Sequence, residues 1–245
     1  NRVCGTIFRK ERKKRGLSLD TMASGLLSRT ALGRMETGRI GWQKLVGDTL
    51  FQRMGIRPDY FETLASSEEM ERWRLREDIC LLILDHPVEA EEKIREYRET
   101  YGVREPLEEQ FLRKGELLLL LKDRAENVWG EHPCDEDKLL RMAEETVSCT
   151  LSGDWKNDLR DMPAAPSELA AVLLDGWVRM TCGRYEEAWK RQCDVWEYPE
   201  RHQWEERMKV WIRPQAALLG MELALGEKDS RKAFELGREA LELLR

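Results

Sequence analysis

The chain lacks the sequence features of membrane proteins and of common enzymes. Its apolar runs, such as the five leucines at 117–121, are far shorter than the ~20 residues that cross a bilayer, and no signal-peptide pattern opens the chain. No GxxxxGK, GxSxG or HExxH motif is present. Carboxylate pairs such as Glu144 and Glu145 fall on polar helix faces, where solvation is the ordinary explanation. We therefore expect a non-enzymatic, cytoplasmic protein without catalytic residues or membrane partners.

Metal-ligand spacing is also missing. There is no CxxC pair, and the three histidines do not stand at ligand spacing from a cysteine. The HPC triplet at 132–134 comes nearest, and its place at a predicted helix start accounts for it better than a metal does. We expect no metal, no cofactor and free thiols at all six cysteines, which are Cys4, Cys80, Cys134, Cys149, Cys182 and Cys193.

Charge is divided very unevenly along the chain. Residues 1–57 contain 13 Lys and Arg but only 4 Asp and Glu, whereas residues 58–245 contain 28 against 43. A basic segment on an acidic remainder is typical of an appended nucleic-acid-binding module, because phosphate neutralisation supplies most of the sequence-independent affinity. The run RKERKKR taken alone is equally consistent with a solvated helix face.

Residues 18–39 predict two short helices joined by a tight turn. Ser18 is suited to cap the first helix, and Leu19, Met22 and Ala23 share one face. Gly25 permits the turn.

Ser28 offers a second N-cap, and Leu32 and Met35 recur at helical spacing. Gly38 is suited to end this second helix in a left-handed conformation. The opposite face is polar, poor in carboxylates and composed of Arg29, Thr30, Gly33 and Arg34.

This stretch resembles the helix-turn-helix of the xenobiotic-response-element (XRE, Cro/repressor-like) superfamily, and particularly that of the Rgg-like and PlcR-like peptide-sensing regulators. The resemblance covers about residues 3–64, through the segments IFRKERKKRG, GLSL, SRTAL and METGR. Met22 stands where leucine is common, and Gly33 stands where a serine often contacts DNA. The resemblance implies a quorum-sensing type of transcriptional regulator that binds double-stranded DNA as a homodimer and senses a short peptide.

A docked second helix would present a defined set of side chains to DNA. Its N-terminal residues would face the base edges, and the flanking cations would face phosphates. The predicted DNA-binding residues are Ser28, Arg29, Thr30 and Arg34 near the bases, with Arg9, Lys10, Lys13, Arg39 and Lys44 at the backbone.

Beyond residue 64 the pattern is that of successive helices, so the predicted fold is all-α: a helix-turn-helix bundle over 1–64 and a tetratricopeptide-like helical solenoid over 65–245. Ser66 and Glu69 form a capping-box pattern, and Pro87 and Pro106 are suited to open helices. We expect a mobile loop at 152–166. Further helices are predicted at 135–151, 167–182, 185–197, 200–225 with Pro214 as a kink or break, and 230–244.

The segment DGWVRMTCGRYEEAWK resembles a tetratricopeptide helix pair most clearly. Gly176 would allow a close helix approach, Gly183 would form the turn, and Tyr185 and Ala188 would pack the second helix on the first. An unrelated helical bundle is the alternative. Weaker echoes stand at Gly220, Gly226, Ala233 and Ala240.

Five of the nine tryptophans lie between residues 177 and 211. They are either core residues between the helices or the lining of a ligand groove. In the groove interpretation, a partly apolar peptide would lie on Trp177, Met180 and Met221, and Arg179 and Arg213 would meet its carboxylate.

Two other functions remain open from the residues alone. The chain could be a helical-repeat scaffold for protein interaction whose helix-turn-helix has degenerated. It could also be a hydrolase of small polar ligands that works through its carboxylates, which would require a carboxyl pKa raised in a cleft.

Overall fold

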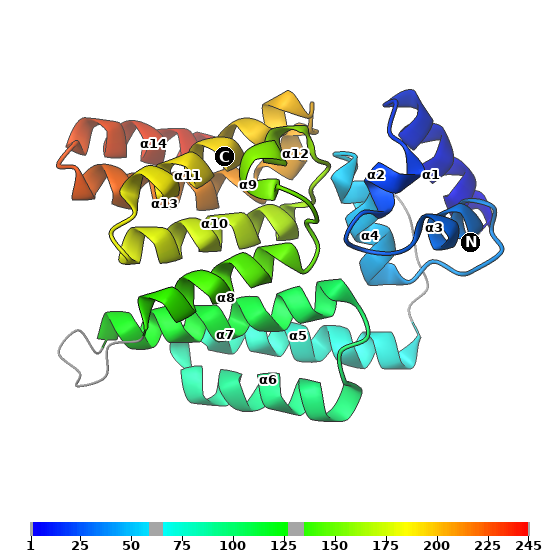
Figure 1. Cartoon of the computed structure of the whole chain (residues 1–245), viewed down its shortest axis with the longest axis horizontal. Coiled ribbons are helices and arrows are strands. Elements are labelled where there is room, and N and C mark those ends of the chain that lie inside the picture. Colours follow the sequence, from blue (N-terminus) through cyan, green and yellow to red (C-terminus); the bar gives the residue numbers. More distant parts are fainter. Residues whose placement is uncertain (1, 59–65, 127–134, 245) are drawn as a thin grey trace.

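The computed structural model describes residues 2–58, 66–126 and 135–244. Throughout these ranges the regular elements are helices and no strand occurs (Figure 1). The predicted all-α fold, a helix-turn-helix bundle followed by a helical solenoid, is therefore confirmed. The predicted boundary between residues 64 and 65 lies outside the described residues.

The first four helices form a small bundle, which we call the head. They are α1 (Arg2–Lys14), α2 (Leu19–Ala23), α3 (Arg29–Glu36) and α4 (Lys44–Arg53). Phe8, Trp42 and Phe51 pack at its centre with ring centroids 5.2–5.9 Å apart. Met22 and Leu32 are fully buried beside them. These apolar positions come from all four helices, so one core holds the head together.

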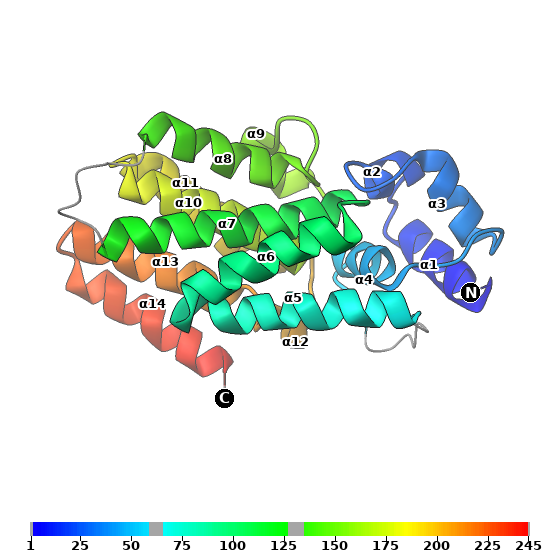
Figure 2. The ribbon, with the colours of Figure 1, turned by 90° about the horizontal axis from the view of Figure 1, so that it is seen from below.

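The later helices, which we call the body, stack as antiparallel pairs (Figure 2). The first helix of each pair lies beside the first helix of the next, since α7 contacts α5 and α10, and α10 contacts α13. This arrangement is the solenoid that the helix pattern predicts. The pairs are α5 (Ser67–Asp85) with α6 (Pro87–Tyr101), α7 (Pro106–Glu126) with α8 (Glu136–Ser148), α10 (Pro166–Thr181) with α11 (Tyr185–Arg201), and α13 (Arg213–Gly226) with α14 (Ser230–Leu243).

Helix starts in the body follow the local signals of the sequence. Ser66 and Glu69 form the predicted capping box on α5, in which the Ser66 hydroxyl accepts from Glu69 N and the Glu69 carboxylate accepts from Ser66 N. Pro87 and Pro106 begin α6 and α7 as predicted. A proline is tolerated there because the first N–H of a helix has no intrahelical acceptor.

Two predictions about the body are wrong in detail. The segment 152–166 is not one long loop, because it contains α9 (Trp155–Asp158) and a 3₁₀ turn (Leu159–Asp161), and both Trp155 and Leu159 are buried. The helix expected at 200–225 does break at Pro214 as predicted, because α13 begins there, but residues 200–212 do not form one helix: α11 continues through Pro199 to Arg201, and a short α12 (Glu206–Lys209) follows. Burial of apolar side chains outweighs the turn signals in the first case.

The helix pair of α10 and α11 matches the tetratricopeptide pattern in all but one position. A Cβ on Gly176 would lie 2.7 Å from Leu219 Cδ2 and 3.2 Å from Arg191 Cβ, so a larger residue here would have to displace the Leu219 side chain. Ala188 is fully buried as expected. Tyr185, however, is 48 % exposed rather than packed against the first helix.

One buried ion pair joins the head to the body. Arg53 at the end of α4 and Glu168 in the first turn of α10 are 1 % and 0 % exposed, and their nearest atoms are 2.6 Å apart. Arg53 also donates to the carbonyl oxygens of Met22, Ser24 and Thr150 at 2.8–3.1 Å. All five guanidinium N–H groups are thereby used, which is the condition for holding a charge inside a protein.

Removal of one partner of this pair should destabilise the whole fold. We expect Arg53→Met to lower the free energy of unfolding by ~3–5 kcal/mol in urea titrations, because Glu168 is left as an uncompensated buried charge. The control is Arg231→Met, which removes an arginine that forms an exposed ion pair with Glu235. Its free energy of unfolding should fall by under ~1 kcal/mol. Equal losses in the two variants would contradict the assignment.

Candidate nucleic-acid interface

The predicted second motif helix forms as α3. The Ser28 hydroxyl accepts from Ala31 N at 3.1 Å, which satisfies one of the free N–H groups of the first turn. Leu32 and Met35 are buried in the head core. At the other end Gly38, with a φ of 70°, ends the helix as predicted. Local capping and one apolar stripe thus account for α3.

The orientation of α3 is set by two contacts from other parts of the head. Arg12 of α1 donates to both carboxylate oxygens of Glu36 at 2.7 and 3.2 Å, and both side chains are nearly buried. Trp42 donates its ring N–H to the carbonyl oxygen of Met35 at 3.3 Å. A bidentate pair at the C-terminal end of α3 restricts rotation of the helix. Sequence reasoning missed this role of Arg12, which had been read only as part of a basic run.

The outer face of α3 is cationic and exposed. Arg29, Thr30 and Arg34 are all exposed, and so is Arg39 just beyond the helix. Arg29 Nη1 lies 3.1 Å from Asp20 Oδ2, with the two side chains 68 % and 63 % exposed. A pair this exposed is worth under ~1 kcal/mol, so a phosphate or base edge can replace Asp20.

Helix α1 adds further exposed cations to the head. Arg9, Lys10 and Lys13 are exposed. In both views α1 and α3 lie at the end of the molecule away from the stacked pairs of the body (Figures 1 and 2). Lys44 differs, because its Nζ binds Asp48 at 2.8 Å and its backbone N–H donates to Glu69 of α5. It therefore lies where the head meets the body.

The turn between α2 and α3 packs directly on the body. Gly25 has a φ of 72°, and a Cβ built on it would lie 1.8 Å from the carbonyl oxygen of Thr150. Ser24 in the same turn contacts the hydroxyl of Ser152. The sequence pointed to Gly25 as a turn residue, but the contact with a residue more than a hundred positions away was not visible in it. This contact places the start of α3 relative to the body.

The predicted peptide-binding residues do not gather in one groove. Trp177 and Met180 of α10 are partly buried and pack against the main core of the body. Met221 lines an apolar groove of about 690 Å³ between α13 and α14. The other four predicted residues line neither this groove nor the larger cavity described below.

The two predicted arginines of that site already have partners. Arg179 is 3 % exposed and contacts the carboxylates of Asp175, Glu144 and Glu187. Arg213 pairs with Glu200 at 2.9 Å and lies over the Trp196 ring. A ligand carboxylate would have to displace these acids, so the geometry does not favour either arginine as a ligand contact. Peptide binding by the five residues remains a prediction.

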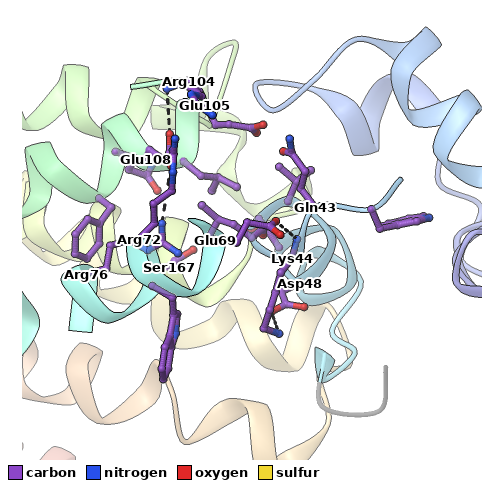
Figure 3. Close-up of a pocket in the computed structure, with 18 of the residues that line it drawn as sticks. Gln43, Lys44, Asp48, Glu69, Arg72, Arg76, Arg104, Glu105, Glu108 and Ser167 are labelled. Carbon is purple, nitrogen blue, oxygen red and sulfur yellow. Dashed lines mark hydrogen bonds and ion pairs between the residues drawn. The ribbon is translucent and has the colours of Figure 1, made fainter. Parts of the chain in front are cut away.

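A larger cavity, which sequence reasoning missed, lies between the head and the body. This cleft has a volume of about 1230 Å³, and its walls come from α4, α5, α7 and the start of α10 (Figure 3). Most of its labelled side chains are charged. Its lining residues are separated in the sequence by well over a hundred positions, from Leu27 to Ser167, so no local pattern could have indicated it.

None of the helices in the described ranges combines the length and apolar character that a membrane crossing requires. In the same ranges, no three His, Cys, Asp or Glu side chains converge to hold a metal ion. The HPC triplet at 132–134 lies outside the described residues.

The fold and the exposed basic helix define an all-helical protein in which a helix-turn-helix head precedes a stack of helix pairs. A solved structure of similar fold is that of Bacillus thuringiensis PlcR in complex with the peptide PapR7 and DNA, with a TM-score of 0.52 and 13 % identity over 99 % of this chain and 80 % of that chain. No protein-family model and no curated protein sequence matches the chain. The similarity therefore concerns the fold.

The packing of Gly25 on Thr150 is testable by a matched pair of substitutions. Gly16 also has a positive φ, of 67°, but a Cβ there would meet nothing within 4 Å. We expect Gly16→Ala to cost ~1–2 kcal/mol from backbone strain alone, and Gly25→Ala to cost at least ~2 kcal/mol more because the turn must move off the body. Urea unfolding of both variants measures the difference, and equal costs would show that the turn is not held this way.

Proposed function

We propose that the chain is a sequence-specific DNA-binding transcriptional regulator whose body dimerises and senses a short peptide. The observation that carries this proposal is the exposed, cationic face of α3, a helix that is oriented by Arg12 and Trp42 and lies at the end of the molecule away from the stacked pairs of the body. A helix with these properties is the element that helix-turn-helix proteins insert in the major groove.

Residue roles follow from position on the head. Arg29 and Thr30 begin α3, and N-terminal residues of a recognition helix are those that reach base edges. Arg34 is one turn further along. The exposed cations Arg9, Lys10, Lys13 and Arg39 are assigned to phosphates. Ser28 supports binding through its cap on α3, and Lys44 contributes positive potential from the start of α4.

The partners in the PlcR structure, which are the peptide PapR7 and DNA, agree with this proposal. At 13 % identity the similarity to PlcR concerns the fold alone. The DNA-binding assignment therefore rests on the side chains of this chain. Its acidic body supports the same assignment, because phosphate would be repelled from every surface except the head.

Dimerisation is proposed because α3 has only eight residues and reads few base pairs. Two copies would read two half-sites about one helical turn apart. The surface that we assign to the second copy is the groove of α13 and α14, where several large apolar side chains are exposed. These are Leu218, Leu225, Phe234 and Leu241, with exposed fractions of 50–71 %.

Binding of a DNA duplex should weaken steeply with salt. Four assigned phosphate contacts in each copy give a slope of about −3.6 in log K against log salt, so affinity should fall ~10²-fold per copy between 50 and 200 mM salt. Fluorescence anisotropy of a labelled duplex measures this. A salt-independent affinity, or no binding to any genomic fragment, would favour the alternative of a helical scaffold with a degenerate helix-turn-helix.

Arg29 should contribute to sequence preference. We expect Arg29→Ala to weaken binding to a selected operator by ~1–3 kcal/mol. The variant protein should still bind unrelated duplexes almost as well as the unchanged protein does. Arg74→Ala, which removes an exposed charge from α5, is the control for net charge. If Arg29→Ala weakens binding to all duplexes equally, Arg29 is a phosphate contact.

A further inference from the structure

The cleft between head and body has the size and composition of a ligand site. Its volume of about 1230 Å³ is above the ~300–1,000 Å³ typical of small-molecule pockets, so the cleft is large enough to hold a ligand. Helix α4 of the head forms one wall, and α5, α7 and Ser167 at the start of α10 form the others (Figure 3). A ligand in this cleft would therefore contact both parts of the molecule.

The carboxylates of the cleft are largely matched by donors within it. Asp48 pairs with Lys44 at 2.8 Å, and Glu69 accepts from the backbone N–H groups of Ser66 and Lys44. Glu108 accepts from Arg72 at 2.6 Å and from the Tyr97 hydroxyl at 2.8 Å, and its pKa is lowered although burial acts in the opposite direction. These acids have little remaining capacity to bind a cation.

Lys114 of α7 differs from these carboxylates because it retains hydrogen-bonding capacity. Its ammonium donates to the carbonyl oxygen of Ser167 at 3.0 Å and, in the part of the chain that the structure describes, forms no ion pair. Burial penalises the ammonium and lowers its pKa to about 8. A lysine has three donors, so this buried cation has capacity for an anion.

A second cation and an apolar wall lie on α5. Trp73, Arg76 and Cys80 recur at helical spacing and all line the cleft. Arg76 donates to Tyr97 at 3.0 Å. The Cys80 thiol is close enough to both Arg76 and Lys114 for each to act on its pKa, so both cations lie in its neighbourhood. Trp73 is 47 % exposed and, with Phe111 of α7, supplies apolar surface.

We propose that this cleft binds a carboxylate-bearing ligand with an apolar portion, whose carboxylate lies on Lys114 and Arg76 and whose apolar portion lies on Trp73 and Phe111. The inference rests on the proposed function and assigns its sensing site to the cleft instead of to the Trp177 surface. A peptide C-terminus and a free organic acid carry the same chemistry.

The site is placed to affect DNA binding. Ser167, which accepts from Lys114, precedes Glu168, and Glu168 holds Arg53 of the head. A ligand that draws the Lys114 ammonium toward itself acts on the residue next to the ion pair that positions α4. The other side of the ligand would contact α4 directly. Occupancy and head orientation are thereby linked through adjacent groups.

The test is affinity capture on the immobilised full chain with mass-spectrometric detection. One probe is a synthetic pool of acetylated heptapeptides without Asp or Glu, so that the C-terminus is the only carboxylate of each peptide. The matched probe is the same pool with C-terminal amides. A third probe is a mixture of octanoate, 4-phenylbutyrate and indole-3-acetate. Each is offered to the unchanged protein, to Lys114→Met, Arg76→Met and Lys114→Arg, and to Lys138→Met, which removes an exposed lysine of α8.

We expect capture of free-acid peptides or of organic acids, and the probe that is captured identifies the source. Lys114→Met and Arg76→Met should each reduce capture at least tenfold, whereas Lys138→Met and Lys114→Arg should retain it. Circular dichroism and duplex binding of each variant check the fold and measure the DNA-binding proposal separately. No capture by the unchanged protein, equal capture of the amides, or full capture by a folded Lys114→Met would overturn the inference.

Discussion

The structure depends on the enclosure of one charge pair, Arg53 with Glu168, between the head and the body. Every N–H of the guanidinium is bound, and three of its acceptors are carbonyl oxygens from two different parts of the chain. Because a buried guanidinium without these acceptors would be very costly, the pair permits one docking geometry and disfavours others. Its consequence is geometric: it holds the head to the solenoid in one orientation.

That orientation separates two surfaces with different chemistry. The cations of α1 and α3 are exposed on helices that lie at the end of the molecule away from the stacked pairs of the body, where a polyanion can approach them, and α4 of the head forms a wall of the charged cleft. Gly25 against Thr150 maintains the same placement at the α2–α3 turn. A rigid contact of this kind allows an event in the cleft to be transmitted to α3 without a flexible connection.

The sequence predicted the local features of the head well and the chemical state of individual arginines poorly. The caps at Ser18 and Ser28 and the buried stripe of α3 follow from spacing alone. The sequence predicts Arg12 as part of a basic run and Arg179 as a contact to a peptide carboxylate, yet Arg12 holds Glu36 and Arg179 is bound by three carboxylates. The sequence shows which residues are charged, but it does not show which distant residue each of them pairs with. The domain limits and the roles of the DNA-contacting residues remain predictions.

By itself, the sequence determined the helical class, the positions of most helix starts and the division into a basic and an acidic part. These features depend on interactions within a few residues or on simple composition. Only the tertiary structure decided that 152–166 folds into the core, that the tryptophans of α10 and α11 pack against it and that α4 and α7 face each other across a cleft. Such contacts join segments distant in the chain, and burial decides them by balancing energies that no local pattern contains.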